Sequence, residues 1–402
     1  MCSGTLECAY DVVVAGAGPA GSVLSRLLAL QGAKVLMVDA APFPRRKPCG
    51  ESLNPGAVQT LSRLYDGRQA DEWLHEASIP HSVLNGWQLN SAAVGSSRMT
   101  TLAASYGDNR YGIGCKRELL DGWLIEQAYR AGVVFEEKTR LERLIWEKGR
   151  LIGVEVRRLG DGQRPQMVRT QMVAGADGIR SAVARSADLS RFGKLRKAAL
   201  TARLNGIDGL SGKVELYVSG DRVIGLAPIG GGLANMTVAL RGLKAMEGAA
   251  TGKAAYLMSE ARQWEALKER FHHAEIEGDV LACGPFERIV RSTALEGMVL
   301  VGDAAGYYDP MTGQGIYRAL RSAELAAPAL MEALQTGSHR ALQWYNRQRL
   351  TEFSGSLRLQ KLIEQASRYE RLWRAGLQVI GASEALTNRL AAAISDSRPV
   401  HR

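Results

Sequence analysis

The 402-residue sequence predicts an α/β protein in three parts: a parallel sheet flanked by helices, an antiparallel sheet, and a helical C-terminal region. Three observations predict these parts. A glycine-rich turn joins an apolar strand to a helix near the N-terminus, short alternating runs fill residues 197–241, and helical spacing dominates after Gln335. A chain of this length has room for about two domains and an appendage.

The first part begins with a strand, a turn and a helix. Tyr10–Ala15 is apolar and β-branched, as expected for a buried parallel strand. Apolar residues at helical spacing predict a helix over Ser22–Gln31, and Lys34–Val38 reads as a second strand that ends at Asp39. The turn between the first strand and the helix consists of Gly16, Ala17, Gly18, Pro19, Ala20 and Gly21.

Each glycine of this G-x-G-x-x-G pattern has a physical task. Gly16 permits the tight turn, Gly18 lets the backbone approach a pyrophosphate, and Gly21 lets the helix pack closely on the strand. The helix N-terminus offers free N–H groups to phosphates. Asp39 stands where a carboxylate accepts hydrogen bonds from ribose hydroxyls. The unit therefore predicts a bound dinucleotide, and by itself leaves FAD and NAD open.

Two later segments continue the pattern. Val173–Ser181 carries Gly-Ala-Asp-Gly with Asp177, and follows a hairpin expected over Arg143–Arg157. Val299–Gly306 is a strand that ends in Gly302 and Asp303, before a helix that runs to about Gln335. A helix N-terminus stabilises the negative charge of a reduced flavin, and glycines let backbone N–H groups come close to it. The loop before this helix contributes Pro310, Gly313, Gly315 and Ile316.

These segments resemble, in order, motifs of the superfamily that holds p-hydroxybenzoate hydroxylase-like monooxygenases, geranylgeranyl reductases and flavin-dependent halogenases. The resemblance covers most of residues 8–335 and implies a Rossmann-like FAD-binding domain of the glutathione reductase type. It implies that Asp177 and Asp303 bind FAD, with Asp303 on the ribityl chain, and that Arg117 lies near the pyrophosphate or ribityl. Lys47–Leu53 resembles the Pro-Cys-Gly loop of the reductase and halogenase branches.

The resemblance and the patterning predict a division of the chain. The FAD-binding domain is expected to be discontinuous, and the antiparallel sheet is expected to lie over the flavin ring and define the substrate site. We expect Glu51, Tyr308 and Pro310 to be catalytic candidates next to the flavin. The expected ranges are 8–75, 110–190 and 283–335 for the FAD-binding domain, 76–109 and 191–282 for the substrate-binding sheet, and 336–402 for the helical C-terminal region.

One G-x-G-x-x-G pattern occurs and no second, so no separate nicotinamide domain is expected, and NAD(P)H or reduced flavin would donate electrons transiently. Halogenation is disfavoured because the segment around Trp87 lacks the Trp-x-Trp-x-Ile-Pro pattern of tryptophan halogenases. No lysine lies between Pro48 and Cys115 either. Three roles remain: hydroxylation of an electron-rich aromatic ring by molecular oxygen through a flavin C4a-hydroperoxide, reduction of alkene bonds as in geranylgeranyl reductases, and a flavin-binding scaffold without catalysis.

Of these, we expect a monooxygenase that hydroxylates an aromatic substrate. The Gly-Ala-Asp-Gly segment resembles that of hydroxylases. The formal charge is +10, and residues 338–402 hold ten Arg and one Lys against four Glu and one Asp, which suits an acidic partner. The halogenase-like segments without the lysine are similar to those of the peptidyl-tryptophan hydroxylase that matures quinohemoprotein amine dehydrogenase. This similarity implies a peptidyl tryptophan as substrate, and the basic C-terminal region suggests that an acidic protein or peptide carries it.

Composition and motifs also argue against several other classes of protein. No nucleic-acid-binding motif accompanies the basic charge. No apolar run approaches the ~20 residues of a transmembrane helix. The five cysteines have no metal-ligand spacing, so we expect neither a disulfide framework nor a metal site, and a reducing cytoplasm fits this usage.

Overall fold

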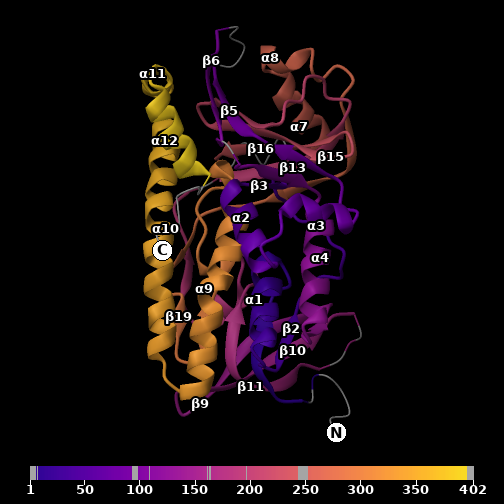
Figure 1. Ribbon diagram of the computed structural model, residues 1–402, viewed down its shortest axis with the longest axis vertical. Coiled ribbons are helices and arrows are strands. Elements are labelled where there is room, and N and C mark those ends of the chain that lie inside the picture. The colour runs from indigo at the N-terminus through magenta and orange to yellow at the C-terminus, as the bar shows by residue number, and fades with distance from the viewer. Residues whose placement is uncertain are drawn as a thin grey trace.

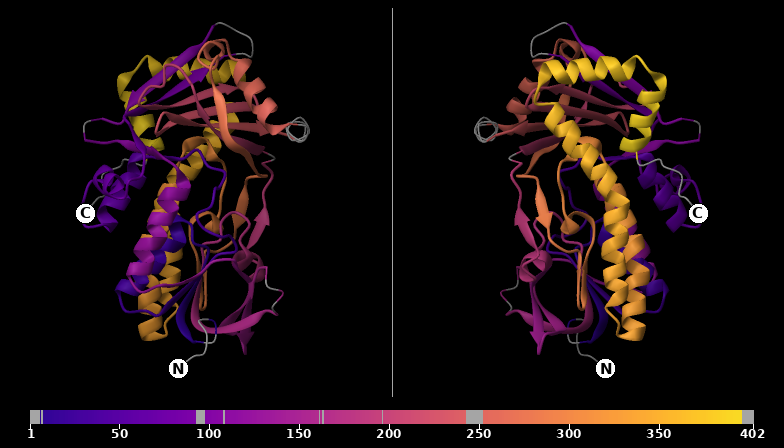
Figure 2. Two further views of the ribbon diagram at one scale, coloured as in Figure 1. Left: turned by 90° about the vertical axis from the view of Figure 1, so that its right-hand side faces the viewer. Right: turned by 90° about the vertical axis from the view of Figure 1, so that its left-hand side faces the viewer.

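The computed structural model describes residues 6, 8–92, 98–107, 109–160, 162, 164–195, 197–242 and 252–395. Two sheets lie one above the other along the long axis of an elongated molecule (Figure 1). The helices of the C-terminal region run along one side of both sheets (Figure 2).

The larger sheet has eight strands and is the predicted parallel unit. Its central order is β20-β11-β1-β2-β8, with parallel pairing throughout, while β19 adds an antiparallel edge beside β20. The predicted hairpin is β9–β10, which extends β11. The strands are β1 (Tyr10–Ala15), β2 (Val35–Val38), β8 (Val134–Glu136), β9 (Thr139–Glu147), β10 (Arg150–Arg158), β11 (Gln166–Gly175), β19 (Ala294–Leu295) and β20 (Met298–Leu300).

Both faces of this sheet are covered, which explains why β1 is apolar at nearly every position. Val12 and Val14 pack toward the helices, and Val13 packs toward β9–β10 on the other side. The small helix α5 (Ala182–Ser186) lies on that other side. The helical layer consists of α1 (Pro19–Leu30), α2 (Pro55–Leu64), α3 (Ala70–Glu76), α4 (Arg117–Arg130) and α9 (Gly315–Thr336).

The second sheet has seven strands in the order β17-β13-β16-β15-β14-β5-β6, and its pairing is antiparallel except between β14 and β5. Helices α7 (Lys253–Arg262) and α8 (Glu265–Lys268) cover one of its faces through a cluster that includes Leu257 and Leu267. Its strands are β5 (Gly86–Ser91), β6 (Thr100–Ser105), β13 (Lys197–Asn205), β14 (Lys213–Ser219), β15 (Arg222–Gly230), β16 (Leu233–Arg241) and β17 (Glu275–Cys283).

Two small sheets lie between the large ones. A Cβ atom on Gly114 would stand 1.9 Å from the carbonyl oxygen of Pro228, so only glycine allows this close approach of β7 to β15. The predicted domain ranges stay a proposal. The small sheets are β3 (Ser52–Leu53), β7 (Gly112–Cys115) and β4 (His81–Leu84), and β12 (Ser190–Phe192) with β18 (Arg288–Val290).

The C-terminal region forms three helices, α10 (Arg340–Ala366), α11 (Glu370–Gly381) and α12 (Glu384–Ile394). The predicted range extends to residue 402, and residues 396–402 lie outside the described part. Helix α10 packs on α9, and α11 and α12 pack on β6 of the second sheet. The helical region therefore spans both sheets.

Two expectations from composition have different outcomes. Among the helices that the structure describes, none is long and apolar enough to cross a bilayer. Cys49, Cys115 and Cys283 are free thiols, but Cys8 is disulfide-bonded, contrary to the expectation of reduced cysteines throughout. The cytoplasm stays a prediction.

Replacing Tyr345 by Phe tests how α10 is anchored. The Tyr345 side chain is fully buried, and its Oη donates a hydrogen bond of 2.6 Å to the carbonyl of Leu300 in β20. We expect Tyr345→Phe to lower the free energy of unfolding by about 1–2 kcal/mol, because a buried carbonyl loses its partner. Urea denaturation measures this, with the exposed Tyr129→Phe as control; equal stability of both variants would contradict the anchoring role.

Candidate functional site

A cavity of about 260 Å³ lies between the two large sheets. Loops of the parallel sheet, the face of the second sheet and the end of the C-terminal region all contribute to its lining. Among the residues predicted for cofactor binding or catalysis, those in the lining are Gly18, Pro19, Ala20, Arg117, Gly302, Asp303, Pro310, Gly313, Gly315 and Ile316. Those outside it are Gly16, Ala17, Gly21, Asp39, Glu51, Asp177 and Tyr308.

The three glycines of the first turn have different surroundings. Gly16 has a φ of +103°, and a Cβ there would lie 2.4 Å from the carbonyl oxygen of Ala176. A Cβ on Gly21 would lie 1.8 Å from the carbonyl oxygen of Gly16. Around Gly18, the nearest atom to such a Cβ is a guanidinium nitrogen of Arg45 at 3.9 Å. Gly16 and Gly21 therefore serve packing, while Gly18 leaves space beside the N-terminus of α1.

Helix α1 begins at this space without a side-chain cap, so its first N–H groups are open to an anion. Asp39 organises the neighbouring loop. Its carboxylate accepts hydrogen bonds from the N–H groups of Ala17 (2.8 Å) and Ala41 (2.9 Å) and lies 3.1 Å from the Arg45 guanidinium. A carboxylate has about four acceptor positions, so capacity remains for ribose hydroxyls.

A second helix N-terminus, that of α9, also lines the cavity. Helix α9 also lacks a side-chain cap, and Cβ atoms on Gly313 and Gly315 would meet no atom within 4 Å. Asp303 lines the cavity at 3.9 Å from the Lys47 ammonium. Two open helix N-termini beside one cavity fit a dinucleotide, with α1 at the phosphates and α9 at an anionic ring. The residues present thus fit FAD.

Arg117 and Asp177 are held by local partners. The Arg117 guanidinium makes two 2.9 Å hydrogen bonds to Asp121 and one of 3.4 Å to the sulfur of Cys49. Asp177 accepts from the N–H groups of Ala182 (2.6 Å) and Val183 (3.3 Å) at the start of α5. Burial raises the pKa of the Asp177 carboxyl. Its FAD contact stays a prediction, since its neighbours Ala176 and Gly178, not Asp177, line the cavity.

Glu51 lies in a buried ion-pair network and not in the cavity lining. Its carboxylate accepts hydrogen bonds from the Nε of Arg203 (2.9 Å), the backbone N–H of Arg117 (2.9 Å) and the amide of Asn235 (3.0 Å). Arg203 pairs with Glu118 as well. These contacts tie the loop after Cys49 to the second sheet. Glu51 itself does not line the cavity, although its partners Arg117 and Asn235 do, and its catalytic role stays a prediction.

Of the two adjacent tyrosines, the structure places Tyr307 and not Tyr308 in the cavity lining. The Tyr308 hydroxyl points toward α10 and donates to Glu364 at 3.3 Å. Burial, together with the charges of Asp303 and Asp309, raises the pKa of Tyr307 well above its usual value. Neighbouring side chains of an extended segment point to opposite sides, so the sequence alone could not decide which of the two tyrosines faces the cavity.

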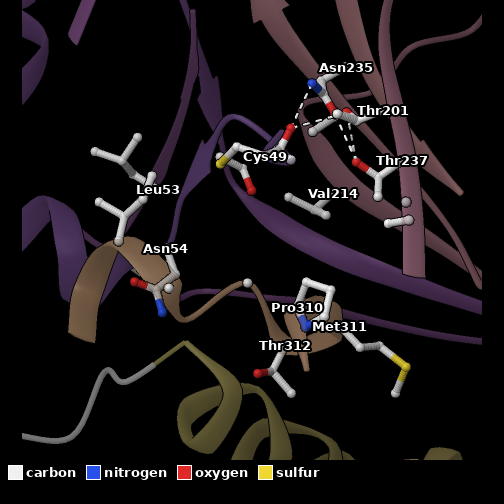
Figure 3. A pocket seen from close by; sticks show the side chains of 18 of the residues that line it. Cys49, Leu53, Asn54, Thr201, Val214, Asn235, Thr237, Pro310, Met311 and Thr312 are labelled. Atoms are coloured by element: carbon white, nitrogen blue, oxygen red, sulfur yellow. Dashed lines mark hydrogen bonds between the residues drawn. The ribbon is translucent and has the colours of Figure 1, made fainter. Parts of the chain in front are cut away.

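Sequence reasoning missed the composition of the wall opposite the FAD loops. It is mostly apolar, and one polar strip of Thr201, Asn235 and Thr237 interrupts it. Thr201 and Asn235 donate to the carbonyl of Cys49 at 3.2 and 2.9 Å (Figure 3). The apolar part consists of Trp87, Leu89, Ala199, Val214, Leu216, Val223, Leu226, Ala227, Ala239 and Phe286, and the C-terminal region adds Ile363 and Ile394.

A family model described as an FAD binding domain matches residues 9–356, so the chain belongs to this family of FAD-binding proteins. It is an FAD-dependent oxidoreductase with FAD as its cofactor. Among named relatives, it is 29% identical over 350 residues to digeranylgeranylglycerophospholipid reductase 1 of Methanococcoides burtonii, covering 84% of this chain and 79% of that one. It is 30% identical over 336 residues to digeranylgeranylglycerophospholipid reductase 1 of Methanopyrus kandleri, covering 81% of each.

Solved structures agree on the fold. The flavin-dependent brominase Bmp2 matches with a TM-score of 0.79 at 20% identity, covering 96% of this chain and 94% of that one. A geranylgeranyl bacteriochlorophyll reductase-like protein from Thermoplasma acidophilum matches with a TM-score of 0.70 at 24% identity, covering 96% and 92%. The predicted superfamily, fold class and FAD cofactor are confirmed.

The predicted hydroxylation is wrong. Similarity to digeranylgeranylglycerophospholipid reductases over most of the chain contradicts it and favours the alkene-reducing alternative. The Gly-Ala-Asp-Gly segment caps α5 in the FAD-binding part, so its resemblance to hydroxylases reflects cofactor binding and does not specify the reaction. The expected aromatic substrate on an acidic carrier, and molecular oxygen as its oxidant, depended on this prediction.

Gly18→Ala tests the cofactor cradle. The new methyl group would meet no backbone atom within 4 Å, so folding should be unaffected. It would occupy the space at the start of α1, and we expect FAD to bind at least about tenfold more weakly. Fluorescence titration of the apoprotein with FAD measures the change. Gly122→Ala in α4, also free of close contacts, is the matched control; unchanged FAD affinity in Gly18→Ala would contradict this assignment.

Proposed function

We propose that the protein reduces carbon–carbon double bonds in the prenyl chains of a lipid. The observation that carries this proposal is the apolar wall of the second sheet, directly opposite the FAD loops. A prenyl chain has no hydrogen-bonding groups, and burying it against Trp87, Leu89 and Leu216 is favourable through the hydrophobic effect. The named relatives, which are reductases of a prenylated glycerophospholipid, support the same substrate class.

Reduced FAD, when bound, supplies the hydride for such a reduction. The chain itself would hold the two ends of the cofactor, with Gly18 and α1 at the phosphates and the loop from Pro310 to Gly315 at the ring. The apolar wall would then align the chain and exclude water. NAD(P)H or a reduced flavin would recharge the cofactor, since no second dinucleotide fingerprint occurs.

Saturating a double bond adds a hydride to one carbon and a proton to the other. We propose that Tyr307 holds this proton at its Oη. Tyr307 lines the cavity, and its phenol is protonated at neutral pH because the shift of its pKa from the usual value is upward. Tyr308 cannot take this role, because its hydroxyl is bonded to Glu364 on the far side.

The proposed reaction can be tested directly. FAD-loaded protein is reduced with dithionite without oxygen and mixed with digeranylgeranylglycerophospholipid in detergent. We expect the flavin to reoxidise and the lipid to gain one dihydrogen per reduced double bond, as detected by mass spectrometry. A flavin that stays reduced with an unchanged lipid would refute the proposal.

Tyr307→Phe tests the proton donor. The variant keeps the ring but loses the hydroxyl, so we expect turnover to fall by about 10²-fold or more while FAD content stays the same. Single-turnover reoxidation of the reduced flavin measures the effect. Tyr308→Phe is the matched control, because the neighbouring hydroxyl lies outside the cavity. Equal activity of the two variants would assign the proton to another group.

A further inference from the structure

The outer face of α11 is apolar although it is exposed. Leu372 and Val379 retain 70% and 66% of their accessible surface. Ala375 and Gly376 are also exposed and lie between them on the same helical face, since residues three and four apart share a face. A helix that packs on its own protein normally turns such a stripe inward. Here Leu377, on the opposite side, is the buried residue of α11.

The apolar face continues beyond α11. Tyr369, just before this helix, is 64% exposed, and Leu362 and Trp344 on α10 are 63% and 41% exposed. The three C-terminal helices occupy the same side of the molecule, which faces the viewer in the right-hand panel of Figure 2. We call the exposed residues Trp344, Leu362, Tyr369, Leu372 and Val379 the outer apolar face.

Cations accompany this face. Residues 340–394 hold nine Lys or Arg and four Glu. Glu364 is one of the four, but it is buried and paired inward with Arg241 at 2.8 Å. Arg347, Arg358 and Arg371 are exposed and form no ion pair with any residue in the described part of the chain. The two helices that carry most of the outer apolar face therefore also carry these three exposed arginines without an ion-pair partner in the described part of the chain.

We propose that the outer apolar face docks on the surface of a lipid bilayer that contains anionic phospholipids. Apolar side chains flanked by arginines are suited to this boundary, where the side chains enter the acyl region and the cations meet the phosphates. An acidic protein would satisfy the cations as well. The choice of a bilayer rests on the proposed function, in which the substrate is a lipid.

The inner side of the same helix leads to the cavity. Leu377, Trp373 and Ile380 pack in one apolar cluster with Trp87 and Leu89, which line the cavity. Only the thickness of α11 therefore separates Leu372 and Val379 of the outer apolar face from that cluster. A docked protein would have its substrate wall one helix away from the bilayer, which gives an apolar chain a short route that avoids water.

Vesicle sedimentation of the FAD-loaded protein tests the docking. We expect binding to vesicles of phosphatidylcholine with phosphatidylglycerol, weaker binding to phosphatidylcholine alone, and weakening by salt. The double variant Leu372→Glu with Val379→Glu should bind about tenfold more weakly or worse, because two charges replace the inserted side chains. Leu30→Glu is the matched control: Leu30 is 58% exposed on α1, and this variant should bind like the wild type.

Three results would overturn the proposal: no binding of the wild type to anionic vesicles, equal binding of the double variant, or equal loss with Leu30→Glu. Binding to soluble polyglutamate without binding to vesicles would assign the face to an acidic protein instead.

The reductase assay in detergent separates the docking proposal from the proposed function. A wild type that binds vesicles but never reduces the lipid would refute the function alone, and an active double variant that binds vesicles fully would refute the docking alone.

Discussion

The buried ion pair between Glu51 and Arg203 is the contact on which the site depends, because it joins the FAD-binding part to the second sheet. Burying two charges is costly unless each is paired and hydrogen-bonded. Here the backbone of Arg117, the amide of Asn235 and the carboxylate of Glu118 complete the network. A second buried pair, Lys197 with Asp309 at 2.7 Å, fastens the same sheet to the loop before Pro310. The two walls of the cavity are thus held at a fixed separation.

This arrangement places the buried charges of these two pairs outside the cavity and leaves an apolar wall inside it. Glu51, which the sequence predicted as a catalytic candidate next to the flavin, is part of this junction. The polar strip of Thr201 and Asn235 is also engaged, since both donate to the carbonyl of Cys49. Among the described residues of this wall none is an acid or a base, which suits an apolar chain and a cofactor that supplies the redox chemistry. The proposed alkene reduction follows from this division of tasks.

The C-terminal helices connect this cavity with the outer surface. The amide of Gln314, at the start of α9, donates to the carbonyls of Ala393 and Ile394 at 3.4 Å, and Gln360 of α10 donates to Gln314 at 3.1 Å. The end of α12 is therefore bonded to the loop that would hold the flavin ring. One short helical unit presents cavity-lining residues inward and the outer apolar face outward. In the proposed function, these helices would connect the surface that contacts the lipid bilayer with the loop that holds the flavin ring.

The sequence by itself determined the features that depend on neighbours along the chain. Gly16, Gly18 and Gly21, the strand before them and the helix after them are one local unit, so spacing alone predicted a dinucleotide cradle. Alternation predicted the strands of the second sheet for the same reason. Only the tertiary structure decided that Glu51 meets Arg203, that Tyr307 and not Tyr308 faces the cavity, and that β5 joins β14 beside the flavin loops. These outcomes depend on which distant segments pair and on the direction of each side chain, and local spacing determines neither.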